Sequence, residues 1–154
     1  MDYVVIKWLH ILSSTFLFGT GIGSAWYMLF ANVSRDVRAI AVVAKYVVIA
    51  DWLFTASTAI LQPLTGFYMI HLAGYPLHSK WIMWSIALYV LAGACWLPVV
   101  WLQIRMRDIA QEAARTGTEL TPQYWRYFRI WVTLGVPAFI AFVAIFWLMV
   151  AKPM

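Results

Sequence analysis

Residues 130–151 read IWVTLGVPAFIAFVAIFWLMVA, a stretch that holds no charged side chain. A helix needs about 20 mainly apolar residues to cross the hydrocarbon core of a bilayer. Three further stretches meet this length, residues 4–32, 46–72 and 81–103. No repeat or linker divides the four stretches. The sequence therefore predicts one all-α domain over residues 1–154, a polytopic four-helix bundle that spans the membrane.

The composition excludes most other classes of protein. Of the 154 residues, 64% are hydrophobic and 11% are charged, whereas soluble proteins have about 25% charged residues. A chain of this length cannot bury so much apolar surface, which excludes a soluble domain, and the same composition excludes a disordered chain. The single Cys95 excludes an internal disulfide framework and multi-cysteine metal sites. The net charge of +5 suits anionic lipid headgroups, so we expect the bilayer, not nucleic acid, as the partner.

Basic residues fall mostly on one side of the predicted bundle. Eight of them lie in or beside two loops, namely Arg35, Arg38, Lys45, Arg105, Arg107, Arg115, Arg126 and Arg129. The other side holds only Lys7, Lys80 and Lys152. The positive-inside rule puts the two loops in the cytoplasm and both termini on the periplasmic side of a bacterial inner membrane. Within the longer loop, residues 104–129, charges spaced three and four residues apart predict a helix that ends at Gly117.

Polar and small residues recur at helical spacing in the first two spans. The first stripe is Lys7, His10, Ser14, Leu17, Gly21 and Ser24, and the second is Asp51, Thr55, Thr58, Gln62, Thr65 and Met69. Polar side chains in lipid face other helices, so both stripes are expected to point into the bundle. Pro63 should bend the second span and free a backbone carbonyl. Two interpretations of Asp51 stay open, an ion pair with Arg126 or Arg129 and a proton relay.

Three glycines form a dense patch in the first span. Gly19, Gly21 and Gly23 alternate along the chain, and Gly19 and Gly23 fit the G-x-x-x-G spacing of closely packed membrane helices. One interpretation is helix packing, either within the chain or in a homo-oligomer formed through the Gly19/Gly23 face. The other is that Gly21 and its neighbours make room for a flat cofactor.

The three histidines, His10, His71 and His78, are predicted to lie at one membrane face. An ionisable residue inside a span is costly, so His10 is a candidate functional residue. Haem b takes one or two axial ligands from histidine or methionine. We expect His10 to be the first iron ligand, with His71 or Met69 as the second.

Two lysines complete the haem hypothesis, and a hydrogen bond of His10 is its alternative. Lys7 and Lys80 are predicted at the same face as the histidines, where they would pair with the haem propionates. The alternative is that His10 makes a hydrogen bond to a neighbouring helix, for example to Gln62 or to a carbonyl.

Two resemblances accompany these residues. The stretch KWLHILSSTFLFGTGIG at 7–23 and LHSKW at 77–81 resemble the HemJ/CopD group of bacterial inner-membrane proteins. The stretches WVTLGVPAF at 131–139 and FWLMV at 146–150 resemble a related, uncharacterised family of predicted four-span integral membrane proteins, over nearly the whole chain. HemJ-type proteins are haem-binding oxidoreductases that act on protoporphyrinogen, and their first-span histidine and third-span lysine match His10 and Lys80. They also carry an arginine and a histidine at the end of span one and a histidine late in span three, which this chain lacks. CopD-like proteins imply copper handling.

Together these features predict an inner-membrane protein that binds haem b and exchanges electrons with quinone or a porphyrin-like substrate. As an enzyme it would be a membrane oxidoreductase. His10 and His71 are the expected metal ligands, and Met69, Lys7, Lys80 and Gly21 the expected further contacts with the cofactor. The alternative is a non-enzymatic accessory or assembly subunit, or a carrier of a small solute or of copper.

Overall fold

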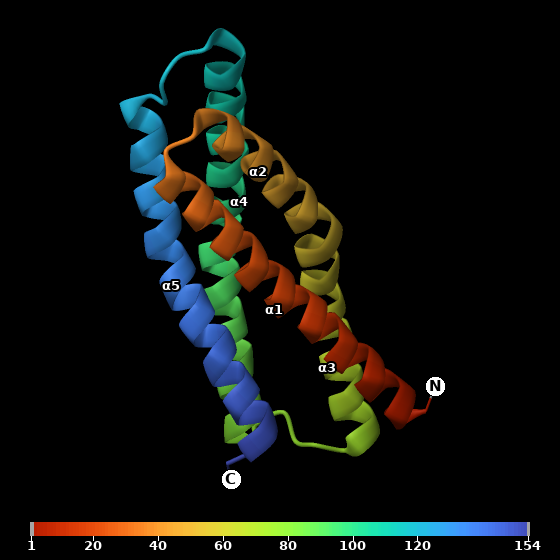
Figure 1. Ribbon diagram of the computed structural model, residues 1–154. Coiled ribbons are helices and arrows are strands. Elements are labelled where there is room, and N and C mark those ends of the chain that lie inside the picture. Colours follow the sequence, from red (N-terminus) through yellow and green to blue (C-terminus); the bar gives the residue numbers. More distant parts are fainter. Residues whose placement is uncertain (1, 154) are drawn as a thin grey trace.

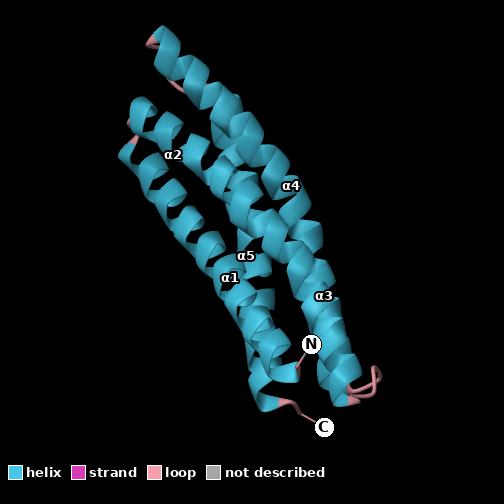
Figure 2. Ribbon diagram, turned by 90° about the vertical axis from the view of Figure 1, so that its right-hand side faces the viewer, coloured by secondary structure: helices cyan, strands magenta, loops and turns pink. Residues whose placement is uncertain are grey.

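The computed structural model describes residues 2–153 (Figure 1). Its helices are α1 (Tyr3–Ser34), α2 (Val37–Ala50), a π-helical turn η1 (Asp51–Thr55), α3 (Ala56–Ala73), α4 (Lys80–Thr116) and α5 (Pro122–Ala151). Because α2, η1 and α3 run on without a break, the described chain contains four helices that are long and apolar enough to cross a membrane. Figure 2 shows helices and loops and no strand within the described part. The predicted all-α, four-span membrane fold is confirmed.

The two ends of the bundle differ in what they hold. The N- and C-termini lie at one end together with the loop 74–79, and we call this the terminus end (Figures 1 and 2). The turn between α1 and α2 and the loop 117–121 lie at the other, which we call the basic end because most of the arginines lie in the helix segments that adjoin these loops. That the basic end faces the cytoplasm stays a prediction.

A capping side chain and two glycines explain where three of the helices begin or end. The carboxylate of Asp36 accepts hydrogen bonds from the backbone N–H groups of Arg38 and Ala39, which caps the start of α2. Gly74 and Gly117 take positive φ angles of 68° and 69° directly after α3 and α4. Glycine adopts this left-handed conformation at little cost, and so it ends helices. The predicted end of the long helix at Gly117 is confirmed.

The predicted inward stripe of the second span is confirmed. Its first five members, Asp51, Thr55, Thr58, Gln62 and Thr65, are all buried, and Met69 is half-buried. The stripe begins in the π-helical turn, in which the Ala56 N–H bonds to the Asp51 carbonyl across five residues. The sequence analysis did not predict this wider turn.

The predicted stripe of the first span is wrong at one position. Lys7 is exposed, whereas Leu17 is buried and His10, Ser14, Gly21 and Ser24 are half-buried. Ser14 donates its hydroxyl proton within its own helix, to the carbonyl of Ile11 at 2.7 Å. Ile6 and Ser13 are also buried, so the inward face of α1 is wider than the predicted stripe.

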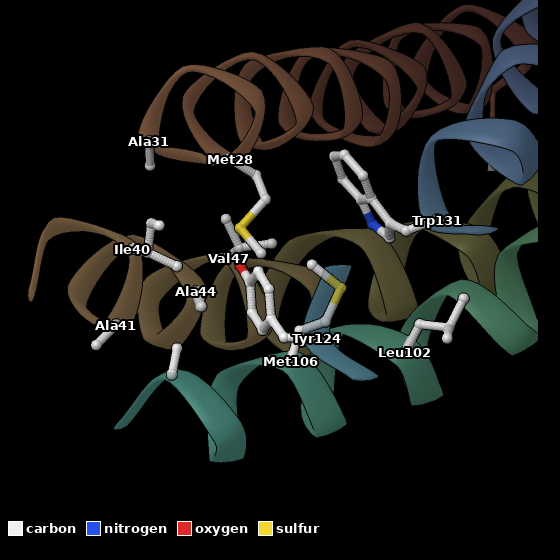
Figure 3. Packing of buried hydrophobic residues seen from close by; sticks show 11 residues of the cluster. Met28, Ala31, Ile40, Ala41, Ala44, Val47, Leu102, Met106, Tyr124 and Trp131 are labelled. Atoms are coloured by element: carbon white, nitrogen blue, oxygen red, sulfur yellow. The ribbon is translucent and has the colours of Figure 1, made fainter. Parts of the chain in front are cut away.

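The packed core lies at the basic end (Figure 3). Met28 of α1, Ile40 of α2, Met106 of α4 and Tyr124 of α5 have no exposed surface. Small side chains between them let the helices approach, namely Ala31, Ala41, Ala44 and Ala110. The Tyr124 hydroxyl donates to Asn32 Oδ1 at 2.7 Å, which satisfies this buried polar pair. The buried Nε1 of Trp131 in the same core has no partner among the described residues.

The terminus end is organised as two helix pairs. There α1 packs on α3, and α4 packs on α5. Aromatic side chains join the pairs: the Phe18 ring of α1 lies 5.1–6.2 Å from the rings of Phe139, Phe142 and Phe146 of α5. One hydrogen bond also joins them, from the Tyr89 hydroxyl of α4 to the Ala59 carbonyl of α3 at 2.6 Å.

Candidate functional site

The contact between α1 and α3 holds His10. Its side chain is half-buried, whereas His71 and His78 are exposed. The Nδ1 atom of His10 lies 2.7 Å from the hydroxyl oxygen of Thr65, a buried residue of α3. The predicted alternative, a hydrogen bond from His10 to a neighbouring helix, is therefore confirmed, with Thr65 as the partner and not Gln62.

The surroundings of Thr65 assign the tautomer of His10. The Thr65 hydroxyl oxygen also lies 2.8 Å from the Leu61 carbonyl and 3.2 Å from the Gln62 carbonyl. Carbonyls only accept, and a hydroxyl has one proton to donate. The two short contacts with carbonyls favour the arrangement in which this proton goes to a carbonyl and Thr65 accepts from the Nδ1–H of His10. A neutral imidazole with its proton on Nδ1 keeps the lone pair on Nε2, which is the arrangement of many metal-binding histidines.

A second hydrogen bond group clamps the backbone of α1 at the same level. The side-chain Nε2 of Gln62 donates to the backbone carbonyl of His10 at 2.8 Å and to the hydroxyl of the buried Ser13. A Cβ added to Gly66 would lie 3.4 Å from His10 Cε1 and 4.0 Å from its Nδ1, which is ordinary van der Waals contact. The imidazole thus lies close to the backbone of α3.

The two predicted second ligands occupy different faces of α3. Met69 follows Thr65 by four residues, about 40° round and 6 Å along an α-helix, and its side chain is half-buried. His71 follows Thr65 by six residues, about 240° round, and it is exposed. Helical geometry therefore puts Met69 near the face of α3 that carries Thr65, and His71 on another face.

The predicted lysines lie on different helix pairs. Lys7 is exposed on α1, one turn before His10. Lys80 begins α4 and lines a hollow together with Lys152 from the end of α5. Their role as partners of the haem propionates stays a prediction.

The glycine patch does not hold two helices of this chain together. A Cβ added to Gly19, Gly21 or Gly23 would meet no other atom within 4 Å. Close packing within the chain is thus excluded as their role. The homo-oligomer and the flat-cofactor interpretations stay predictions.

The comparison with protein families agrees with this architecture. Residues 4–153 match the family described as "Predicted integral membrane protein (DUF2269)". The chain belongs to this family. Neither a curated protein nor a solved structure matches it.

The family covers all four spans and includes His10, Gln62 and Thr65 within the matched residues. Its description assigns an integral membrane location and names no reaction. The resemblance to an uncharacterised family of integral membrane proteins is thus confirmed, while the looser resemblance to the HemJ/CopD group stays a prediction.

Asp51 is buried and forms no ion pair with any of residues 2–153. The Thr55 hydroxyl donates to its Oδ1 at 2.9 Å. Across residues 2–153 the ion pairs are Arg107–Asp108 and Arg115–Glu112. The predicted pair with Arg126 or Arg129 is wrong, because α5 packs on α4 and leaves both arginines exposed, away from η1.

Four residues of this region were not predicted as parts of a site. Thr65 was recognised only as a member of the inward stripe, and Ser13, Gly66 and Tyr89 were not singled out. For Tyr89 a signal existed: Pro63 lacks an N–H, which leaves the carbonyl four residues earlier free. This carbonyl belongs to Ala59, and the Tyr89 hydroxyl satisfies it. The sequence thus predicted a freed carbonyl and named neither Ala59 nor its donor.

Proposed function

We propose that this protein is a haem b-binding redox protein of the bacterial inner membrane, with His10 as an iron ligand. One observation carries the proposal: His10 Nδ1 is bonded to Thr65 at 2.7 Å, which leaves Nε2 as the free ligand atom. Haem iron in proteins takes axial ligands from histidine nitrogen and methionine sulfur.

The residues around His10 fit haem better than a bare metal ion. Across residues 2–153, no three histidine, cysteine, aspartate or glutamate side chains gather closely enough to hold a metal. Copper bound by protein alone needs several such ligands or thioethers. In haem, the porphyrin supplies four nitrogen ligands to the iron, so the protein needs to supply only one or two. His10 supplies one, and the half-buried Met69 on the same face of α3 is the candidate for the second.

The proposal gives each neighbour of His10 a defined task. When bound, haem supplies one-electron transfer. Thr65 keeps the proton on Nδ1 and orients the ring, as acceptors beside metal-binding histidines do. Gln62 holds the backbone of α1 at His10, and Gly66 leaves space for the ring on α3. The partner for electron exchange that we propose is quinone, since the histidines that mark HemJ-type proteins at the ends of spans one and three are absent.

The test is the colour of the purified protein. Expressed with ample haem supply and purified in mild detergent, the wild type should show a Soret band and sharp α and β bands after reduction. His10→Ala should lose these bands, whereas His78→Ala, a change at an exposed histidine of the same end, should keep them. Met69→Leu should change the spectrum, and His71→Ala should not.

Two results would reject the proposal. One is a colourless wild type under these conditions, and the other is an unchanged haem spectrum in His10→Ala. His10→Gln, checked by size-exclusion chromatography, separates loss of the ligand from loss of the fold, because glutamine keeps a polar group next to Thr65.

A specific observation also favours the alternative, a non-enzymatic accessory subunit. Several hydroxyls of the inward stripe bond within their own helix: Thr58 donates to the Phe54 carbonyl at 2.5 Å, and Thr65 donates to that of Leu61 at 2.8 Å. A stripe satisfied in this way serves helix packing and needs no ligand. A colourless wild type would support this second function.

A further inference from the structure

A group of cationic side chains surrounds a hollow at the terminus end, between the start of α4 and the end of α5. The hollow has a volume of about 290 Å³ and is lined by His78, Ser79, Lys80, Trp81, Lys152 and Pro153. None of these residues takes part in the contact between α1 and α3. The hollow is therefore separate from the candidate haem site, and a role for it does not rest on the proposed function.

Aromatic side chains hold Lys152 at this hollow. Its Nζ lies 3.4 Å from the Tyr75 hydroxyl, 5.2 Å from the centre of the Tyr75 ring and 5.6 Å from the centre of the Trp81 ring. The two rings meet edge to face, with their centres 5.5 Å apart. Cations over aromatic faces are held in place by such contacts. The backbone of Lys152 is left-handed, with φ at 42°, a conformation that costs energy in a residue other than glycine.

No carboxylate of the described residues lines the hollow, and the first turn of α4 holds no acidic residue. The ion pairs within residues 2–153 involve arginines of α4 and neither lysine. Two lysines at one hollow attract an anion, most strongly where the surrounding medium is poorly polar.

The position of the hollow indicates which anion reaches it. Tyrosine and tryptophan side chains mark the level of the lipid headgroups in membrane proteins, and Tyr75 and Trp81 lie beside this hollow. Phosphate is the anionic group of headgroups at that level, and lysine binds it as a point charge. We propose that the hollow formed by Lys80 and Lys152 binds the phosphate group of an anionic phospholipid.

Thermal unfolding of the purified protein in neutral detergent tests this proposal. Short-chain phosphatidylglycerol should raise the unfolding temperature of the wild type by about 2–4 °C more than short-chain phosphatidylcholine does. The double variant Lys80→Gln/Lys152→Gln should lose this difference. Lys152→Arg, which keeps the charge, should retain most of it. Arg38→Gln/Lys45→Gln removes equal charge at the basic end and serves as the matched control, which should behave as the wild type.

Inorganic phosphate distinguishes the source of the phosphate group. If the hollow recognises the lipid, phosphate alone should give little rise and should reduce the effect of phosphatidylglycerol by competition. A full rise with inorganic phosphate alone would overturn the assignment to a lipid. An equal response of the double variant to phosphatidylglycerol, or no lipid-specific rise in the wild type, would overturn the site itself.

Discussion

At the basic end four helices meet in one apolar core, whereas at the terminus end two helix pairs are joined by polar and aromatic contacts. Met28, Ile40 and Met106 are fully buried in the core, with alanines between the helices. The terminus end instead relies on the hydrogen bonds of His10 and Gln62 within one pair. Between the two helix pairs, the contacts are those of the Phe18 ring with Phe139 and of the Tyr89 hydroxyl with the Ala59 carbonyl.

This difference follows from the solvent. Lipid is as apolar as leucine, so burying apolar side chains drives membrane helices together less than it does in water. Close packing over small residues and hydrogen bonds between helices take over that role. The basic end uses the first and the terminus end uses the second. Both proposed sites, the contact around His10 and the hollow with its two lysines, lie at the terminus end.

The membrane orientation of the two ends is the prediction with the largest expected effect, because each reporter reads as either periplasmic or cytoplasmic. A reporter fused at the C-terminus or inserted in the loop 74–79 should read as periplasmic, and one inserted near Gly117 as cytoplasmic. The reason is the split of eight basic residues against three between the two ends. Paired alkaline phosphatase and green fluorescent protein fusions measure it. The opposite readout would exchange the membrane faces of the two proposed sites.

The packed core should depend on the volume of its side chains. Met106→Ala removes a side chain with no exposed surface and leaves a cavity. This should lower the free energy of unfolding by about 2–4 kcal/mol. Titration with a denaturing detergent, followed by circular dichroism, measures the loss. Ile140→Ala on α5, where the side chain is 60% exposed, is the control. Similar losses in both variants would remove the distinction between a packed basic end and a looser terminus end.

The polar contact between α1 and α3 should contribute less. Gln62→Leu removes the hydrogen bonds to the His10 carbonyl and to Ser13, so we expect a loss of about 1 kcal/mol, as for other bonds between membrane helices. Ser57→Ala is the control, since Ser57 bonds only carbonyls of its own helix region. In a double-mutant cycle with Ser13→Ala, additive losses would show that Gln62 and Ser13 do not interact.

The sequence alone determined which segments span the membrane and which face of α3 is buried. Length and apolar composition decide the first, since a bilayer requires about 20 apolar residues for a span. The stripe from Asp51 to Thr65 decided the second, because polar side chains at helical spacing must turn away from lipid. The end of α4 was also predictable, because Gly117 can adopt a positive φ at little cost.

Only the tertiary structure decided which groups meet. His10 was predicted as a candidate, yet its partner Thr65 and the contact with Gly66 depend on how α1 crosses α3. Asp51 bonds Thr55, and not an arginine, because α5 packs on α4 and away from η1. Helical periodicity describes one helix at a time and gives the face that each residue occupies. The partner across the interface is set by the crossing of two helices and by the π-helical turn, and neither leaves a periodic trace in the sequence.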